Sequence, residues 1–145
     1  MIRLALAFGA LVGGCGPTTP DGWTRQPMAD GAYSLAVPSG VTCSHETGVD
    51  SDVARCAGGG LDLALDWGRY GGVPPGAEGL RTERVGGRDV VVARELGVTV
   101  YHFETEPVGL GDGTFADAVT LTAHARCGTE PACETARQIV RSVRF

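Results

Sequence analysis

The stretch LDLALDW, residues 61–67, decides the fold class, because its apolar and polar residues alternate along the chain. Such alternation is typical of a β-strand that buries one face and exposes the other. The buried face would carry Leu61, Leu63, Leu65 and Trp67, and the opposite face Asp62, Ala64 and Asp66. We therefore expect an antiparallel sheet with one face packed on a core.

More strands are expected on both sides of this stretch, because apolar residues alternate there between turn-forming residues. They are residues 32–37, 41–45, the two arms of a hairpin over 81–94, 98–104 and 115–126. Gly86-Gly87 suits the tight turn of the hairpin, since glycine tolerates positive φ angles. The last three elements should form an antiparallel meander. The polar, glycine-rich segments 45–60 and 68–80 are expected to be loops.

The end of the chain changes to a helical period. Thr129 can cap a helix that carries Pro131 in its first turn. Its apolar stripe would be Ala132, Ala136, Ile139, Val140 and Val143. The sequence thus predicts an α+β domain, a mostly antiparallel sheet of about five to seven strands packed by one C-terminal α-helix.

Two segments resemble those of a known fold family. Residues 33–38, which spell Tyr-Ser-Leu-Ala-Val-Pro, and residues 139–145 at the chain end are similar to the ends of PsbP-like α+β sandwiches. The resemblance implies a curved sheet closed by a final helix. It implies no activity, because one fold hosts many functions.

The first residues have the order of an export signal, with Arg3, a short apolar run over 4–12 and then small residues. The run is too short to span a bilayer, which takes about twenty apolar residues. Val12-Gly13-Gly14-Cys15 resembles the bacterial lipobox. The resemblance implies cleavage before Cys15, acylation of that cysteine and a stable lipid anchor in the cell envelope. Under the sorting rule of enteric lipoproteins, Gly16 after the cysteine would imply the periplasmic side of the outer membrane.

These features give the expected organisation of the chain. Residues 1–14 would be the signal peptide, 15–30 the lipidated cysteine with a flexible tether, and 31–145 a single domain. The tether assignment rests on the turn-forming residues 16–22. Ordered structure is expected to begin between Trp23 and Gly31.

Assigning Cys15 to lipid leaves an even number of cysteines, which in an oxidising compartment indicates disulfides. Three pairings are possible for Cys43, Cys56, Cys127 and Cys133. Proximity in the sequence favours Cys43–Cys56 and Cys127–Cys133. Neither pair has the close spacing of a zinc or thioredoxin-like motif, so metal ligation and redox catalysis are disfavoured.

The chain is acidic, with a formal net charge of −5, and removing the signal peptide would also remove Arg3. It therefore lacks the basic footprint of a nucleic-acid binder, and membrane attachment must come from the lipid.

His102 and His124 lie on strands expected to pair, and with Asp117 or Glu104 they are the candidates for a metal site. No other catalytic pattern is present. Asp62 and Asp66 share a strand face at about 13 Å, too far apart for a catalytic carboxylate pair. Residues 109–113 are expected to be a turn rather than a phosphate or calcium loop. No Gly-x-Ser-x-Gly motif occurs.

We therefore expect a non-enzymatic, lipid-anchored binding or assembly module of the envelope, with no cofactor and with another envelope protein as partner. Partner contact should fall on the sheet face opposite the helix or on segments 46–60 and 68–80. Two alternatives stay open. One is a metal-dependent hydrolase that uses His102 and His124. The other is a periplasmic immunity lipoprotein whose acidic charge suits a basic toxin.

Overall fold

The computed structural model describes residues 19–104 and 119–145, and these form two antiparallel sheets and one α-helix. The larger sheet has seven strands in the order β3-β4-β5-β9-β8-β7-β6, and β1 pairs with β2 in the smaller one. The elements are β1 (Trp23–Met28), the 3-10 turn η1 (Ala29–Gly31), β2 (Tyr33–Pro38), β3 (Thr42–Thr47), β4 (Ser51–Gly58), β5 (Leu61–Gly68), β6 (Glu78–Val85), β7 (Arg88–Glu95), β8 (Val98–Phe103), β9 (Thr120–Cys127) and α1 (Glu130–Arg141). The predicted α+β class is confirmed.

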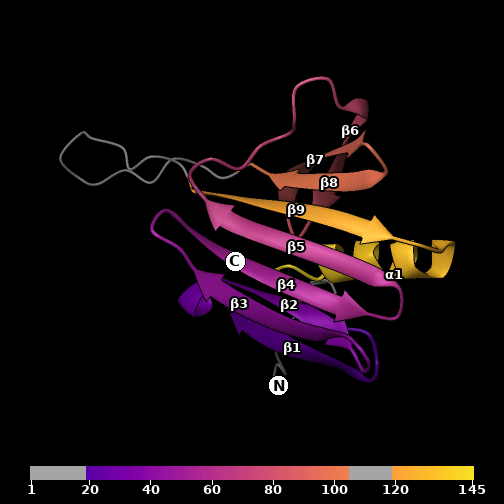
Figure 1. Ribbon diagram of the computed structural model, residues 1–145. Coiled ribbons are helices and arrows are strands. Elements are labelled where there is room, and N and C mark those ends of the chain that lie inside the picture. The colour runs from indigo at the N-terminus through magenta and orange to yellow at the C-terminus, as the bar shows by residue number, and fades with distance from the viewer. Residues whose placement is uncertain (1–18, 105–118) are drawn as a thin grey trace, which may run out of the picture.

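The seven-stranded sheet has a core face and an outer face. Its core face carries Leu61, Leu63 and Leu65, all buried, and packs against α1 and β2. In Figure 1, α1 lies beside β5 and β9, and the β1–β2 hairpin lies beside β3 and β4. The outer face carries Asp62, Ala64 and Asp66, as the alternation in LDLALDW predicts. One face of the sheet thus packs on the core.

The C-terminal segment ties the two layers together. The backbone N–H of Ala36 donates to Ser142 Oγ at 2.7 Å, and this hydroxyl donates to the Ile139 carbonyl at 2.6 Å. Ser34 and Arg144 exchange backbone hydrogen bonds of 2.8 and 2.9 Å. The second edge of β2 is therefore occupied by the residues that follow α1, which satisfies backbone groups that would otherwise be unpaired.

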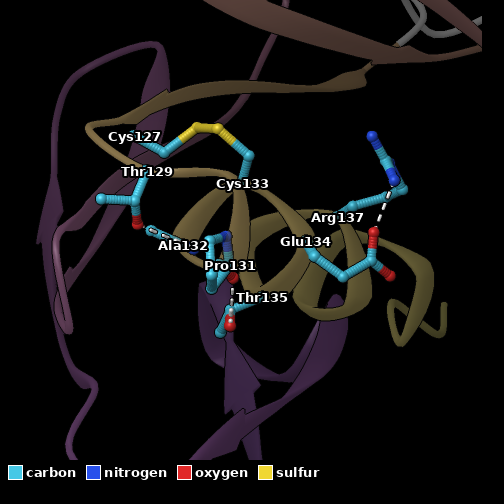
Figure 2. Close-up of a disulfide and its surroundings, with 8 residues drawn as sticks. All are labelled: Cys127, Thr129, Pro131, Ala132, Cys133, Glu134, Thr135 and Arg137. Atoms are coloured by element: carbon cyan, nitrogen blue, oxygen red, sulfur yellow. Dashed lines mark hydrogen bonds and ion pairs between the residues drawn. A yellow bond between two sulfur atoms is a disulfide. The ribbon is translucent and has the colours of Figure 1, made fainter.

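The helix begins as predicted. Figure 2 shows Thr129, whose hydroxyl accepts from the Ala132 backbone N–H at 3.4 Å, and Pro131 in the first turn. The Cys127–Cys133 disulfide joins the end of β9 to this turn. The predicted apolar stripe from Ala132 to Val143 is buried. No helix of the described residues is long and apolar enough to cross a membrane.

Most predicted strands are confirmed; where both ends lie in the described residues, they coincide with the predicted ends or differ by at most three residues. The hairpin turns at Gly86 and Gly87, whose φ angles are 56° and 83°. The expected meander is also confirmed, because β6, β7, β8 and β9 pair in sequence order. The predicted strand over 115–126 is described only from residue 119 onward, and the predicted turn over 109–113 lies outside the described residues.

The prediction of a loop over 45–60 is wrong. Residues 51–58 form β4, which pairs with β3 on one side and with β5 on the other. Its inward residues are Asp52, Ala54 and Cys56, of which none is large and apolar. The core-facing alternation of β4 is therefore invisible to a search for large hydrophobic residues.

From residue 19 onward, the first regular element is β1 at Trp23, the early limit of the predicted range and inside the segment 15–30. β1 carries Thr24, Arg25 and Gln26 and has little apolar periodicity of its own. It forms because β2 offers an edge for pairing from Trp23–Pro38 to Met28–Tyr33.

Candidate functional site

Both predicted disulfides are present. Cys43 and Cys56 face each other directly across β3 and β4, and Cys127 joins Cys133. All four cysteines predicted to form disulfides are thus used structurally. Cys15, the predicted lipidation site, lies outside the described residues.

His102 and His124 lie on the paired strands β8 and β9 and on the outer face, but they do not face each other. His102 is opposite Thr122, and His124 is opposite Val100. His102 Nδ1 and Thr122 Oγ1 lie 3.0 Å apart and share a hydrogen bond whose direction depends on the ring tautomer. Burial lowers the pKa of His102, and the charge of Glu104 partly opposes this shift. Asp117 lies outside the described residues.

Within residues 19–104 and 119–145, no group of three His, Cys, Asp or Glu side chains is arranged to hold a metal ion. Asp62 and Asp66 share the outer face, as predicted, but each is opposite different neighbours. Asp62 is opposite Ala57 and Arg126, whereas Asp66 is opposite Val53 and Thr122. Ser142 Oγ is engaged by backbone groups, and Ser34 Oγ accepts from Arg25 at 3.0 Å.

The middle of the outer face contains a hollow of about 190 Å³, which we call the outer-face hollow. Its floor is Ala64, whose small side chain leaves space between larger neighbours. Its other lining residues are Arg55, Asp62, Val98, His124 and Arg126. Because Arg55, Ala64 and His124 form one register row across β4, β5 and β9, three rigid strands hold this site.

Charges around the outer-face hollow are not paired with one another. Asp62 and Arg126 are direct cross-strand partners, yet in the described part of the chain neither has an ion pair or side-chain hydrogen bond. Arg84 and Asp89, the corresponding pair on β6 and β7, are joined at 2.8 Å. Arg55 and Arg126 are both exposed. The hollow therefore offers two guanidinium groups and one carboxylate to a partner.

A second hollow, of about 350 Å³, lies where β5 ends and β3 turns into β4. Its wall segments, η1, the 47–52 turn and residues 67–69, are at the left of Figure 1. The charged residues in its lining are Asp30, Asp50, Asp52 and Arg69, and its lining also includes Trp67 and Thr47. We call it the acidic hollow, because three aspartates outnumber the single arginine.

Three buried side-chain oxygens of the described residues have no hydrogen-bond partner, on Asp52, Tyr33 and Asp66, and the first two bear on the acidic hollow. Asp52 is only 9% exposed, and its Oδ2 accepts from Thr47 Oγ1 at 3.1 Å, whereas its Oδ1 is unpartnered. The hydroxyl of Tyr33, a residue 1% exposed, is also unpartnered. Burial, followed by the charges of Asp52 and Asp66, raises the pKa of Tyr33 above its ordinary value. Buried polar groups are normally satisfied, so this cluster requires an explanation.

Trp67 joins the acidic hollow to an aromatic cluster of the core. Its ring lies 5.9 Å from that of Tyr33 and 5.8 Å from that of Phe145, centroid to centroid. The Arg88 guanidinium lies 4.2 Å from the Phe145 ring centroid. Trp67 packs at the rim of the core, on the strand face predicted for it, and Trp23 is also partly buried against the core. The aromatic cluster therefore fixes the position of the Trp67 side chain in the wall of the hollow.

The sequence did not point to several of the residues that line the two hollows. The outer face and segments 46–60 and 68–80 were the predicted contact surfaces, and both hollows use parts of them. Arg55, Arg126, Asp52 and Tyr33 were not singled out. The alternation of Asp52, Ala54 and Cys56 could have placed Arg55 on the outer face, because Arg55 falls between the inward residues.

No protein-family model, curated protein or solved structure matches this chain. The resemblance of residues 33–38 and 139–145 to PsbP-like sandwiches stays a prediction.

Proposed function

We propose that this protein is a lipid-anchored, non-enzymatic binding module of the bacterial cell envelope and that it holds a partner protein on the outer face of its sheet. The lipobox-like residues 12–15 support the anchor, and the two disulfides agree with an oxidising compartment. Gly16 after the cysteine supports the periplasmic side of the outer membrane. The net negative charge supports a protein partner rather than nucleic acid.

One observation carries the choice of surface, namely the unpaired charges around the outer-face hollow. Opposite charges that face each other across strands usually pair and stabilise the sheet. Asp62 and Arg126 are placed to do so, yet they do not pair with each other or with another side chain of residues 19–104 and 119–145. A partner could engage these groups without first breaking an ion pair within the described part of the chain, so binding would cost less desolvation and rearrangement.

The chemistry of the hollow indicates which group of the partner enters it. Arg55 and Arg126 outnumber Asp62, and guanidinium groups bind carboxylates in a planar, two-bond geometry. An aspartate or glutamate of the partner would therefore occupy the hollow above Ala64. Asp62 would exclude partners that present two carboxylates close together, because like charges repel.

Charge reversal tests this surface. The full chain, retrieved from membranes after chemical crosslinking, should carry one specific partner protein. Arg55→Glu with Arg126→Glu should abolish that crosslink, because the partner carboxylate would meet two negative charges. Arg94→Glu makes the same kind of change on the core-face side of β7 and should leave the crosslink intact. If the protein that carries both Arg55→Glu and Arg126→Glu crosslinks as well as the native protein, the outer face is not the contact surface.

A separate experiment tests the anchor. Cys15→Ser should abolish labelling with a radioactive or clickable palmitate analogue and should move the protein out of the membrane fraction. The folded domain should be unaffected, since residues 19–145 contain the other four cysteines and the described core. Membrane retention of the Cys15→Ser protein would overturn the lipoprotein assignment.

A further inference from the structure

The acidic hollow is separate from the outer-face hollow and has a different construction. It is formed by η1, the β3–β4 turn and the end of β5, and it shares no lining residue with the outer-face hollow. About 350 Å³ is enough for a group of several heavy atoms. The hollow is therefore large enough for a side chain or a small molecule.

One unpartnered oxygen belongs to the lining of this hollow, and another lies on a residue packed against its wall. Asp52 lines the hollow, and only one of its two carboxylate oxygens accepts a hydrogen bond, which Thr47 donates. Tyr33 contacts the Trp67 ring, which also lines the hollow, and its hydroxyl lacks a partner. A buried carboxylate oxygen without a donor is costly, and the cost disappears when a charged donor binds to it. The missing partner is thus a positively charged hydrogen-bond donor.

The chemistry of the lining separates two kinds of cation. Calcium or magnesium would need several oxygen ligands around one point, and the described residues include no group of three acidic, His or Cys side chains so arranged. An organic cation needs fewer fixed ligands. Its N–H groups can bond to Asp52, and its positive charge is attracted to an aromatic ring such as that of Trp67.

We propose that the acidic hollow binds an ammonium or guanidinium group, held by Asp52 at its inner end and by Trp67 in its wall. Asp52 Oδ1 accepts an N–H of the cation, and Tyr33, which senses the charge of Asp52 and packs on Trp67, supports the wall from behind. Asp30 and Asp50, both exposed at the mouth, attract the cation from solution. Two kinds of ligand carry such a group, namely a free amine and the basic side chain of a protein. The proposal does not depend on the outer-face function.

Tryptophan fluorescence of the full chain in detergent tests the proposal. Trp23→Phe leaves Trp67 as the only tryptophan of the chain, so its emission reports on the hollow. Putrescine represents a free amine and N-acetyl-lysine amide represents a protein side chain. At least one of them should bind saturably with one site per chain. N-acetyl-norleucine amide, which has the same shape without the charge, should not bind.

Matched variants assign the site. Asp52→Asn keeps the side-chain shape and should weaken binding at least roughly tenfold, because a hydrogen bond to a charged group is lost. Tyr33→Phe should weaken it less. Asp21→Asn removes the same charge in the turn that precedes β1 and should leave binding unchanged. Near-ultraviolet circular dichroism confirms that each variant is folded.

The outcomes separate the possibilities. Asp52-dependent binding of putrescine alone assigns a free amine, and Asp52-dependent binding of the lysine analogue assigns a protein side chain. Absence of saturable binding by either cation to the folded native chain would overturn the proposal and would mean that internal water satisfies the two oxygens. Equal weakening by Asp21→Asn and Asp52→Asn would also overturn it, because only the overall charge would then matter.

Discussion

The two hollows differ in how their charges are held. The outer-face hollow lies on the middle of three strands, and its arginines and Asp62 are exposed to water. The acidic hollow lies where strands end, and its key carboxylate, Asp52, is buried with one oxygen unpartnered. Solvated charges cost the fold little, whereas a buried unpaired oxygen lowers the free energy of unfolding.

This difference predicts where binding and stability are linked. At the outer-face hollow, a charge can change without affecting the fold, because the sheet is held from its other face. At the acidic hollow, removal of an unpartnered polar group should stabilise the ligand-free protein while it weakens binding. A substitution that raises the free energy of unfolding and lowers affinity is expected at a binding site that contains unfavourable interactions.

The largest effect should come from the core directly behind the outer-face hollow. Leu63 is fully buried on the core face of β5, next to Asp62 on the outer face. Leu63→Ala should lower the free energy of unfolding by about 2–5 kcal/mol, because it removes buried surface and leaves a cavity. Asp62→Ala should change it by less than about 0.5 kcal/mol. Urea denaturation measures both, and similar losses would contradict the separation of the two faces.

The next largest effect concerns the disulfide that joins β3 and β4, the two strands whose connecting turn lines the acidic hollow. Cys43 and Cys56 connect β3 to β4, and the turn between these strands walls the hollow. Replacing both cysteines by serine should cost about 3 kcal/mol in the chain-entropy account of loop closure. Amine binding should weaken as the stability falls. Crosslinking at the outer-face hollow should persist in the folded fraction. Unchanged amine binding would show that the turn needs no covalent support.

A smaller effect of opposite sign is expected at Tyr33. Tyr33→Phe removes an unpartnered buried hydroxyl and should raise the free energy of unfolding by about 1 kcal/mol in the absence of ligand. Tyr101→Phe is the control, because the Tyr101 hydroxyl interacts with the Arg137 guanidinium and the loss of that interaction should destabilise by about 1 kcal/mol. Thermal denaturation distinguishes the two signs. Destabilisation by both would mean that a water molecule satisfies Tyr33.

The smallest effect is a pH dependence that arises at His102. Burial lowers its pKa in the folded protein, so the unfolded chain binds the proton more readily. Stability is therefore retained above the unfolded pKa of about 6.5 and falls as the pH drops through it. In urea denaturation at a series of pH values, His102→Gln should show a shallower loss of stability on acidification. His45→Gln, exposed on the edge strand β3, should retain the native profile.

The sequence predicts those parts of the fold whose signals are local. Residues 61–67 alternate clearly, Thr129 and Pro131 mark the start of α1, and Gly86-Gly87 marks a hairpin turn. The disulfides follow because each cysteine pairs with its sequence neighbour. All of these depend on residues within a short window, where pattern and propensity are informative.

The parts that escaped prediction depend on distant contacts or on small inward residues. β5 pairs with β9, and β6, β7 and β8 lie between them in the sequence. The core face of β4 carries Asp52, Ala54 and Cys56, so no large apolar residue marks it in the sequence. The acidic hollow combines η1, the β3–β4 turn and the end of β5. Proximity of such segments is set by the assembled sheet, which no short window of sequence records.

The order of the disulfides along the chain also has a consequence for biogenesis. Cys43 and Cys56 are 13 positions apart, Cys127 and Cys133 are 6 apart, and the two bridges do not interleave. A chain that enters an oxidising compartment N-terminus first exposes each cysteine together with its correct partner, long before a wrong one arrives. Correct pairing would then follow from the timing of translocation, and the protein would place little demand on disulfide isomerases.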